Sequence, residues 1–163
     1  MIAIIDYDAG NIKSVEKALT RLGEQVTVTR NPEEILGACG VILPGVGAFG
    51  DAMERLKSYG LVETIAQVAE RRIPFLGICL GLQLMFESSE ESPGVKGLGL
   101  VPVRILRIPD DGGLKVPHMG WNSLKFPHAG RLFKGLPQDS YVYFVHSYYL
   151  QADDYSFVKA TTE

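Results

Sequence analysis

The chain has 163 residues, of which 46% are hydrophobic and 21% charged, and its formal net charge at pH 7 is −3. A chain of this length is most simply one globular domain, which buries about 70% of the surface of its unfolded state. Its 16 basic and 19 acidic residues form no basic tract that would bind phosphates, so nucleic acid is not expected as a partner.

Short apolar runs alternate with amphipathic segments through the first half of the chain. The apolar runs predict strands over residues 1–6, 25–29, 41–43 and 75–78. Helices are predicted over residues 11–22, 51–59 and 61–71, and a further helix begins at residues 31–34, with Asn11 and Asn31 as N-caps. Strands that alternate with helices favour an α/β fold, in which an open, mostly parallel sheet carries helices on both faces.

The second half has a different character, because residues 88–140 are rich in glycine, proline and short apolar runs. We expect this segment to form hairpins and loops that are inserted around the sheet. The runs at residues 141–150 and 157–161 are β-prone and predict two more strands. No repeat, low-complexity tract or linker divides the chain, so residues 1–163 are predicted to form a single domain.

The N-terminal segment and the cysteines of the chain indicate the cellular compartment. The N-terminal segment MIAIIDYDAG has no basic leader, and its apolar run is too short for a signal peptide or a membrane span. We therefore expect no contact with a membrane. The two cysteines, Cys39 and Cys79, lie in dissimilar settings, which fits a reducing cytoplasm better than a disulfide framework. No Cys/His cluster has the spacing of metal ligands, so no metal site is expected either.

Residues 77–83, GICLGLQ, carry the strongest chemical signal. Glycine stands two places before and two places after Cys79, where a predicted strand passes into a helix. This pattern is typical of a nucleophile elbow, whose small residues permit a strained turn that lifts the nucleophile out at the carboxyl end of the sheet. A helix N-terminus favours the thiolate, which is the attacking species. On the glycines alone, a small core residue is an equally good interpretation of Cys79, and it is the preferred one for Cys39.

Acyl transfer to a thiol also needs hydrogen-bond donors for the developing oxyanion. The backbone N–H of Leu80 is one expected donor, and the loop PGVG at residues 44–47 is expected to supply a second. The same loop supports another hypothesis, because Gly45, Gly47 and Gly50 match the G-x-G-x-x-G fingerprint of a dinucleotide-binding oxidoreductase. That fingerprint normally follows the first strand and needs a substrate domain as well, so this function ranks second.

Six segments of the chain resemble those of class I glutamine amidotransferases, and most closely those of the glutaminase subunits of imidazole glycerol phosphate synthase. They are DYDAGN at 6–11, LPGVGAFG at 43–50, GICLGLQLMFE at 77–87, PGVKGLGL at 93–100, VPHMGWN at 116–122 and YFVHSY at 143–148. The cysteine elbow is shared by all class I amidotransferases, whereas PHMGWN and YFVHSY together are specific to this subunit. The resemblance covers the whole chain and implies a flavodoxin-like sheet.

The resemblance implies a role for each matching residue. Cys79 would attack the carboxamide of L-glutamine, releasing ammonia and forming a glutamyl thioester that water hydrolyses. Val46 and Gly47 would lie near the reacting carbonyl, with Leu80 as the other oxyanion donor. The residues that would hold the substrate are Gly45, Gln83, Ser147 and Tyr148. No cofactor is implied.

The resemblance also implies a partner, a (β/α)₈-barrel cyclase subunit that receives the ammonia through an internal channel. The cyclase combines the ammonia with a phosphoribosyl-bearing imidazole carboxamide nucleotide during histidine biosynthesis. The residues implied at the interface are Asn11, His118, Met119 and Trp121. An aromatic anchor such as Trp121 fits the composition of interface hot spots, although a lone tryptophan is more often buried packing.

The chain departs from the family in one respect. Family members supply the general base and its orienting group from a His-Pro-Glu segment beyond residues 157–161, followed by a closing helix. Neither occurs within the 163 residues, so we expect the chain to be part of a longer functional protein. His146 is the nearest rival base, but a hydrogen-bonded structural histidine is the preferred interpretation. A third hypothesis is an amidotransferase-like module that binds the partner without catalysis.

Overall fold

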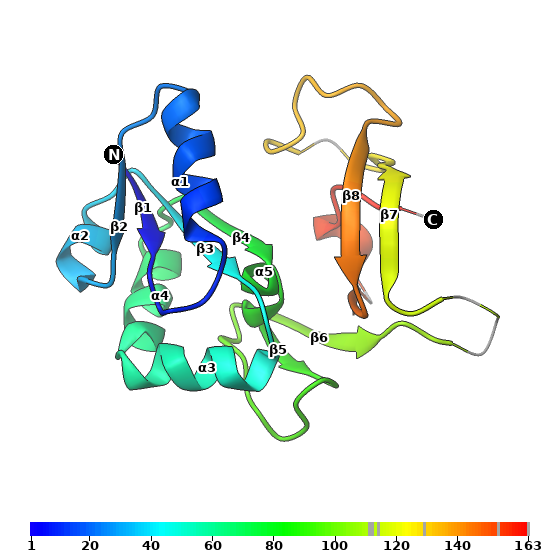
Figure 1. The fold of residues 1–163 in the computed structure, drawn as a ribbon, viewed down its shortest axis with the longest axis horizontal. Coiled ribbons are helices and arrows are strands. Elements are labelled where there is room, and N and C mark those ends of the chain that lie inside the picture. The colour runs from blue at the N-terminus through cyan, green and yellow to red at the C-terminus, as the bar shows by residue number, and fades with distance from the viewer. Residues whose placement is uncertain (111–112, 114, 129, 153, 163) are drawn as a thin grey trace. The chain divides into compact units, whose positions relative to one another are not determined.

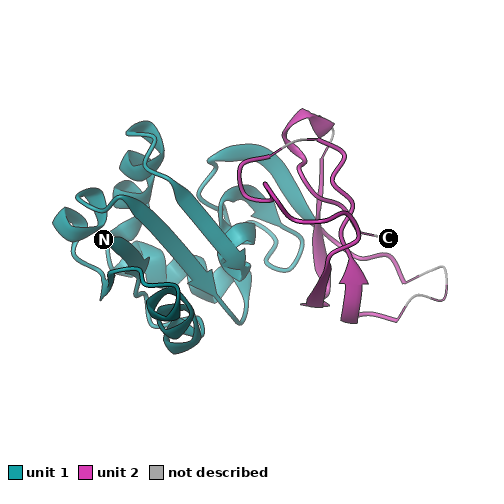
Figure 2. Ribbon diagram, turned by 90° about the horizontal axis from the view of Figure 1, so that it is seen from above, with its two compact units in different colours: residues 1–105 teal, residues 106–163 magenta. Residues whose placement is uncertain are grey.

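The computed structural model describes residues 1–110, 113, 115–128, 130–152 and 154–162 (Figure 1). These residues form two compact units, Met1–Ile105 and Leu106–Glu163, which Figure 2 colours separately. The prediction that residues 1–163 form one domain stays a prediction.

A four-stranded parallel sheet organises the first unit (Figure 1). Its strands are β1 (Ile2–Ile5), β2 (Val26–Thr29), β3 (Gly40–Gly45) and β4 (Phe75–Cys79), in the order β2-β1-β3-β4. The helices between and after them are α1 (Ile12–Arg21), α2 (Pro32–Leu36), α3 (Phe49–Ser58), α4 (Leu61–Glu70) and α5 (Leu80–Leu84). The predicted α/β fold with a parallel sheet is confirmed.

The core of this unit follows from the alternation of side chains along its strands. Ala3, Ile5 and Tyr7 lie on one face of β1 and its extension, and all three are fully buried. They join buried side chains of α2, α3, α4 and α5 in one cluster. Helix α1 contributes no buried residue to that cluster and lies on the opposite face of the sheet (Figures 1 and 2).

The two predicted N-caps are also confirmed. The Asn11 side-chain oxygen accepts a hydrogen bond from the Ser14 N–H at 3.4 Å, and α1 begins at the next residue. The Asn31 side-chain oxygen accepts from the Glu33 N–H at 2.9 Å, ahead of α2. Each cap satisfies a backbone N–H that has no partner within its helix.

The region after the elbow differs in part from the prediction of hairpins and loops. Strands β5 (Phe86–Ser89) and β6 (Val101–Arg107) pair in parallel, because the chain between them crosses back before β6 begins. A parallel pair needs such a crossover, which glycine and proline content alone does not distinguish from a hairpin turn.

The second unit contains an antiparallel pair of strands, and the β-prone run at 141–150 forms strands as predicted. Strands β7 (His118–Ser123) and β8 (Tyr141–His146) pair in the register His118↔His146, and β9 (Tyr148–Gln151) follows after Ser147. The predicted strand at 157–161 is wrong. The Asp154 carboxylate accepts from the Ser156 N–H at 2.8 Å and supports a 3-10 turn, η1 (Tyr155–Phe157), so that only Thr161 forms a bridge, with Lys125.

Candidate active site

Cys79 stands at a strained turn between β4 and α5. It is the last residue of β4 and the N-cap of α5, with φ 54° and ψ −118°. A non-glycine residue in such a conformation costs about 1–3 kcal/mol, which the surrounding structure must offset. Its thiol is exposed, whereas the next side chain, Leu80, is 4% exposed. The predicted elbow geometry is therefore present, with the sulfur at the surface and the turn anchored in the core.

The glycines on either side of Cys79 are required by lack of space. A Cβ atom at Gly77 would lie 2.5 Å from the Cα of Leu82. A Cβ atom at Gly81 would lie 1.8 Å from the carbonyl oxygen of Leu43 on β3. Both distances are shorter than any tolerated contact with backbone, so no larger residue fits while strand and helix pass this closely.

The register of the sheet places the glycine-rich loop beside the thiol. Gly45, the last residue of β3, lies opposite Cys79 on β4. Val46 and Gly47 follow directly, with Val46 54% exposed and Gly47 at φ +92°. Leu80 is the first residue of α5, where a backbone N–H has no partner within the helix. Candidate oxyanion donors and the thiol thus meet at the carboxyl edge of two adjacent strands.

A buried tyrosine behind this loop was not predicted as a site residue. The Tyr7 hydroxyl donates a hydrogen bond to the Pro44 carbonyl oxygen at 2.7 Å. Burial raises the pKa of Tyr7 to about 12, an effect that Arg55 opposes and Cys79 reinforces. The hydroxyl is therefore protonated, and a donor, throughout the physiological range. Residues 7 and 44 are far apart in sequence, and only the alternation of Asp6, Tyr7 and Asp8 at a strand end hinted that Tyr7 points inward.

The N-terminus of α3 argues against the dinucleotide hypothesis. A dinucleotide fingerprint places a pyrophosphate on the first N–H groups of the helix. Here the Phe49 N–H donates to the Glu91 carboxylate at 2.8 Å, and the Gly50 N–H donates to the Ser92 hydroxyl at 2.9 Å. A carboxylate of the protein already occupies the position that the phosphates would need.

The histidine that might rival a catalytic base is engaged within the second unit. His146 Nδ1 lies 2.9 Å from the Tyr148 carbonyl oxygen, which can only accept, so Nδ1 carries the proton. His146 Nε2 is then an acceptor, and His118 Nδ1 lies 3.1 Å from it. Both ring nitrogens of His146 thus have partners, as expected of a structural histidine.

The other predicted residues are distributed over both units. Gln83 lies half-buried on α5 in the first unit. Ser147 and Tyr148 lie at the junction of β8 and β9 in the second unit, where the Ser147 carbonyl accepts from the Ile108 N–H at 2.9 Å. Their role in holding glutamine stays a prediction.

The predicted interface residues are partly exposed and partly engaged. Met119 and Trp121 are two residues apart on β7, so their side chains lie on the same face of the strand, where they are 61% and 67% exposed. His118 lies on the other face and bonds to His146, and Asn11 caps α1.

Within the described residues, no helix is long and apolar enough to cross a bilayer. Nor do those residues gather three or more side chains that could hold a metal ion.

Comparison with known proteins identifies a family and, within the relatives found, proteins that share one name. Residues 3–163 match the model of the family described as glutamine amidotransferase class-I. The imidazole glycerol phosphate synthase subunit HisH of Moorella thermoacetica is 57% identical over 162 residues, which are 99% of this chain and 76% of that protein. The same subunit of Methanocaldococcus jannaschii is 50% identical over 154 residues, or 94% of this chain and 76% of that protein.

Solved structures share the fold at low sequence identity. A glutamine amidotransferase crystal structure superposes with a TM-score of 0.76 at 18% identity, covering 98% of this chain and 79% of the other. A glutamine amidotransferase from Thermotoga maritima gives a TM-score of 0.66 at 18% identity, covering 99% of this chain and 66% of that one.

Proposed function

Because the chain belongs to the class I glutamine amidotransferase family, we propose that it is the glutaminase subunit of an imidazole glycerol phosphate synthase. The observation that carries the proposal is the exposed thiol of Cys79 on a strained elbow, directly opposite Gly45 of the glycine-rich loop. Relatives that are 57% and 50% identical in sequence bear the name of this subunit.

In the proposed reaction the Cys79 sulfur, as thiolate, attacks the side-chain carbonyl carbon of L-glutamine. A C–S bond forms, and the carbonyl oxygen takes the negative charge of the tetrahedral intermediate. Collapse of that intermediate breaks the C–N bond, and the nitrogen leaves as ammonia after it takes up a proton. Water then adds to the thioester, which gives glutamate and returns the thiol.

The carboxyl edge of β3 and β4 suits the stabilisation of that oxyanion. We assign the Leu80 N–H and the amides of Val46 and Gly47 as donors. Leu80 directly follows Cys79, and Val46 and Gly47 directly follow Gly45, the residue that pairs with Cys79. A single preorganised donor of this kind contributes about 2.7–4 kcal/mol to the transition state. We assign Gly45, Gln83, Ser147 and Tyr148 to glutamine binding.

The partner in this proposal is a cyclase subunit that uses the ammonia, in a heterodimer that acts in the cytoplasm. The exposed pair Met119 and Trp121 is suited to that contact, because large aromatic and Met side chains are enriched in interface cores. Asn11 and His118 are also assigned to the contact with the cyclase. Ammonia made without an acceptor is wasted, so glutaminase turnover is expected to rise when the cyclase and its ligand are bound.

Replacement of the nucleophile tests the reaction. In a version of the protein that also carries the family's His-Pro-Glu segment, Cys79→Ser should lower glutamine hydrolysis with the cyclase present on the order of a million-fold, since the attacking group is lost. Cys39→Ser is the matched control, because Cys39 is exposed, contrary to the core position expected for it, and lies just before β3 beside Met1 rather than at the elbow. Ammonia release and thermal unfolding should be measured for both variants.

Covalent labelling separates an enzyme from a binding module that lacks catalysis. A glutamine-mimicking electrophile should modify Cys79 and leave Cys39 unmodified, as read by mass spectrometry of the peptides. Normal ammonia release by a folded Cys79→Ser variant would refute the nucleophile. Cyclase binding without labelling or ammonia release would favour the non-catalytic module.

A further inference from the structure

Residues 6–10, which lead from β1 to α1, present two different faces. Side chains alternate along the segment, so Asp6 and Asp8 point to the surface while Tyr7 is fully buried. The surface face binds neighbouring elements, and the buried face contacts the glycine-rich loop of the candidate active site. One short segment therefore touches both a polar network and the strand that leads to the oxyanion donors.

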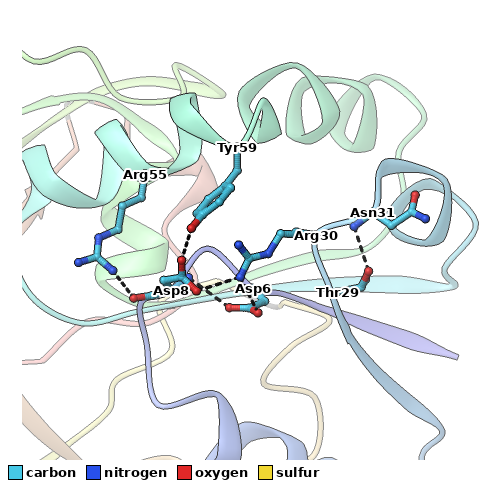
Figure 3. A network of polar contacts seen from close by, with 7 residues as sticks. All are labelled: Asp6, Asp8, Thr29, Arg30, Asn31, Arg55 and Tyr59. Atoms are coloured by element: carbon cyan, nitrogen blue, oxygen red, sulfur yellow. Dashed lines mark hydrogen bonds and ion pairs between the residues drawn. The ribbon is translucent and has the colours of Figure 1, made fainter.

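The surface face is held from two directions (Figure 3). Arg30 Nη2 donates to Asp6 Oδ2 and to Asp8 Oδ1, both at 2.9 Å. The Tyr59 hydroxyl, at the end of α3, donates to the other carboxylate oxygen of Asp8. Arg55 donates to the Asp8 carbonyl oxygen, and the Arg30 guanidinium lies 4.2 Å from the centre of the Tyr59 ring.

These contacts fix the backbone on both sides of Tyr7. Asp8 has a φ of +60°, which a non-glycine residue adopts at a free-energy cost and which its partners must offset. The hydrogen bonds from Tyr59 and then Arg30 lower the pKa of Asp8, so its carboxylate stays charged and paired near neutral pH. Because one guanidinium binds both Asp6 and Asp8, the residue between them has little freedom to shift.

The buried face rests against Pro44 and Gly45, the first two residues of the glycine-rich loop at 44–47. The Tyr7 hydroxyl donates to the Pro44 carbonyl at 2.7 Å and would lie 2.9 Å from a Cβ atom at Gly45. A Cβ atom at Gly10 would lie 3.0 Å from Pro44 Cβ and 3.2 Å from its carbonyl carbon. The chain at Pro44–Gly45 is therefore confined from behind by Tyr7 and Gly10.

We propose that Tyr7 is a positioning residue for the glycine-rich loop, and that the network on Asp6 and Asp8 holds Tyr7 in place. The hydroxyl fixes the Pro44 carbonyl, which keeps Gly45 opposite Cys79 and limits any reorientation to the amides after it. Tyr7 touches no reacting atom in this role. The inference rests on the proposed glutaminase function and adds a residue to its machinery.

The test uses a tyrosine-to-phenylalanine replacement, which removes the hydroxyl and keeps the ring. In Tyr7→Phe with the cyclase bound, kcat for glutamine hydrolysis should fall about tenfold or more, because small misplacement of a donor can cost 10²-fold. The KM for glutamine should stay near the parent value. Tyr155→Phe is the matched control, since its ring is 61% exposed in the second unit, and its kcat should not change.

Alkylation of Cys79 by iodoacetamide distinguishes an effect on the oxyanion donors from a general distortion of the site. This displacement builds no oxyanion, so Tyr7→Phe should react at a rate close to that of the parent. A folded Tyr7→Phe with unchanged kcat would overturn the proposal. Equal slowing of hydrolysis and alkylation would also overturn it, because the role would then be structural.

A second variant decides the matter if Tyr7→Phe does not fold. Arg30→Gln removes the guanidinium from the surface without opening the core, and it should lower kcat in the same selective way. Unchanged kcat in Arg30→Gln would then overturn the proposal. Failure of the glutaminase function itself would appear differently, as equal ammonia release by the parent and by Cys79→Ser when both carry the His-Pro-Glu segment.

Discussion

The two units of the chain bury their apolar side chains to different degrees. In the first unit, large side chains next to the elbow are fully buried, for example Leu43 on β3 and Leu56 on α3. In the second unit the paired strands β7 and β8 leave Trp121 67% exposed and Tyr143 54% exposed, in edge-to-face contact at 5.7 Å between ring centres. The candidate nucleophile thus lies in the unit with the more completely buried core, while Trp121, which is assigned to partner binding, is exposed.

The contrast has a physical basis in what each task requires. A nucleophile and its oxyanion donors must be held within a fraction of an ångström, which only side chains locked by packing can ensure. A binding surface must instead present large side chains to solvent before its partner arrives. The first unit meets the first requirement through its sheet, and the second unit's hairpin is supported by cross-strand pairs.

Truncation of one large side chain in each unit should produce the largest difference. Leu56→Ala in the first unit should lower the free energy of unfolding by about 2–5 kcal/mol, because it opens a cavity in a sealed core. Trp121→Ala in the second unit should change it by only about 0.5 kcal/mol, as for other exposed positions. Denaturant unfolding of both variants measures the two values.

The same pair should behave in the opposite way towards the cyclase. Trp121→Ala should weaken binding by about 2 kcal/mol or more if it is an interface hot spot, as read by titration calorimetry. Leu56→Ala should bind normally at temperatures where it is folded. A Trp121→Ala variant that unfolds easily but binds the cyclase normally would reverse the comparison.

Sequence patterns predicted the first unit well because its determinants are local. The apolar periods and the caps Asn11 and Asn31 locate the helices and strands to within a few residues of where they lie. The glycine spacing around Cys79 located the elbow, since only glycine leaves room for Leu43 O and Leu82. Local chemistry of this kind is written in adjacent residues.

Features that depend on distant partners were missed or wrong. The contact between Tyr7 and Pro44 joins residues far apart in sequence, and no local pattern indicates it. The β-prone run at 157–161 forms no strand, because a strand exists only through its neighbour and here the side chain of Asp154 favours a 3-10 turn. The parallel pairing of β5 and β6 likewise depends on the path of the chain between them.

Glycine replacements should sharpen the comparison with a smaller effect. Gly81→Ala should destabilise the protein by about 1–3 kcal/mol and reduce labelling of Cys79, because the new methyl group would collide with the Leu43 carbonyl in a packed site. Gly135→Ala in the second unit has φ +87° and no described atom within 4 Å, so only backbone strain of about 1–2 kcal/mol is expected. Equal labelling of Cys79 in both variants would contradict the close approach at the elbow.

The smallest effect concerns one carboxylate in each unit and its dependence on pH. Hydrogen bonds from Tyr59 and then Arg30 lower the pKa of Asp8 below the ordinary value for an aspartate, and hydrogen bonds from Ser156 lower the pKa of Asp154 in the same way. Each charged form therefore stabilises the folded state above pH 3.8, and that contribution is lost as pH falls through the folded pKa. Asp8→Asn should be less stable than the parent near pH 7, with a difference that shrinks at about pH 3. Asp154→Asn should differ less at either pH, because an asparagine oxygen still accepts the Ser156 N–H, whereas Asp8→Asn loses the charge that pairs with Arg30. Thermal unfolding at both pH values measures this, and an Asp8→Asn difference that is as large in acid as at neutral pH would exclude charge as its source.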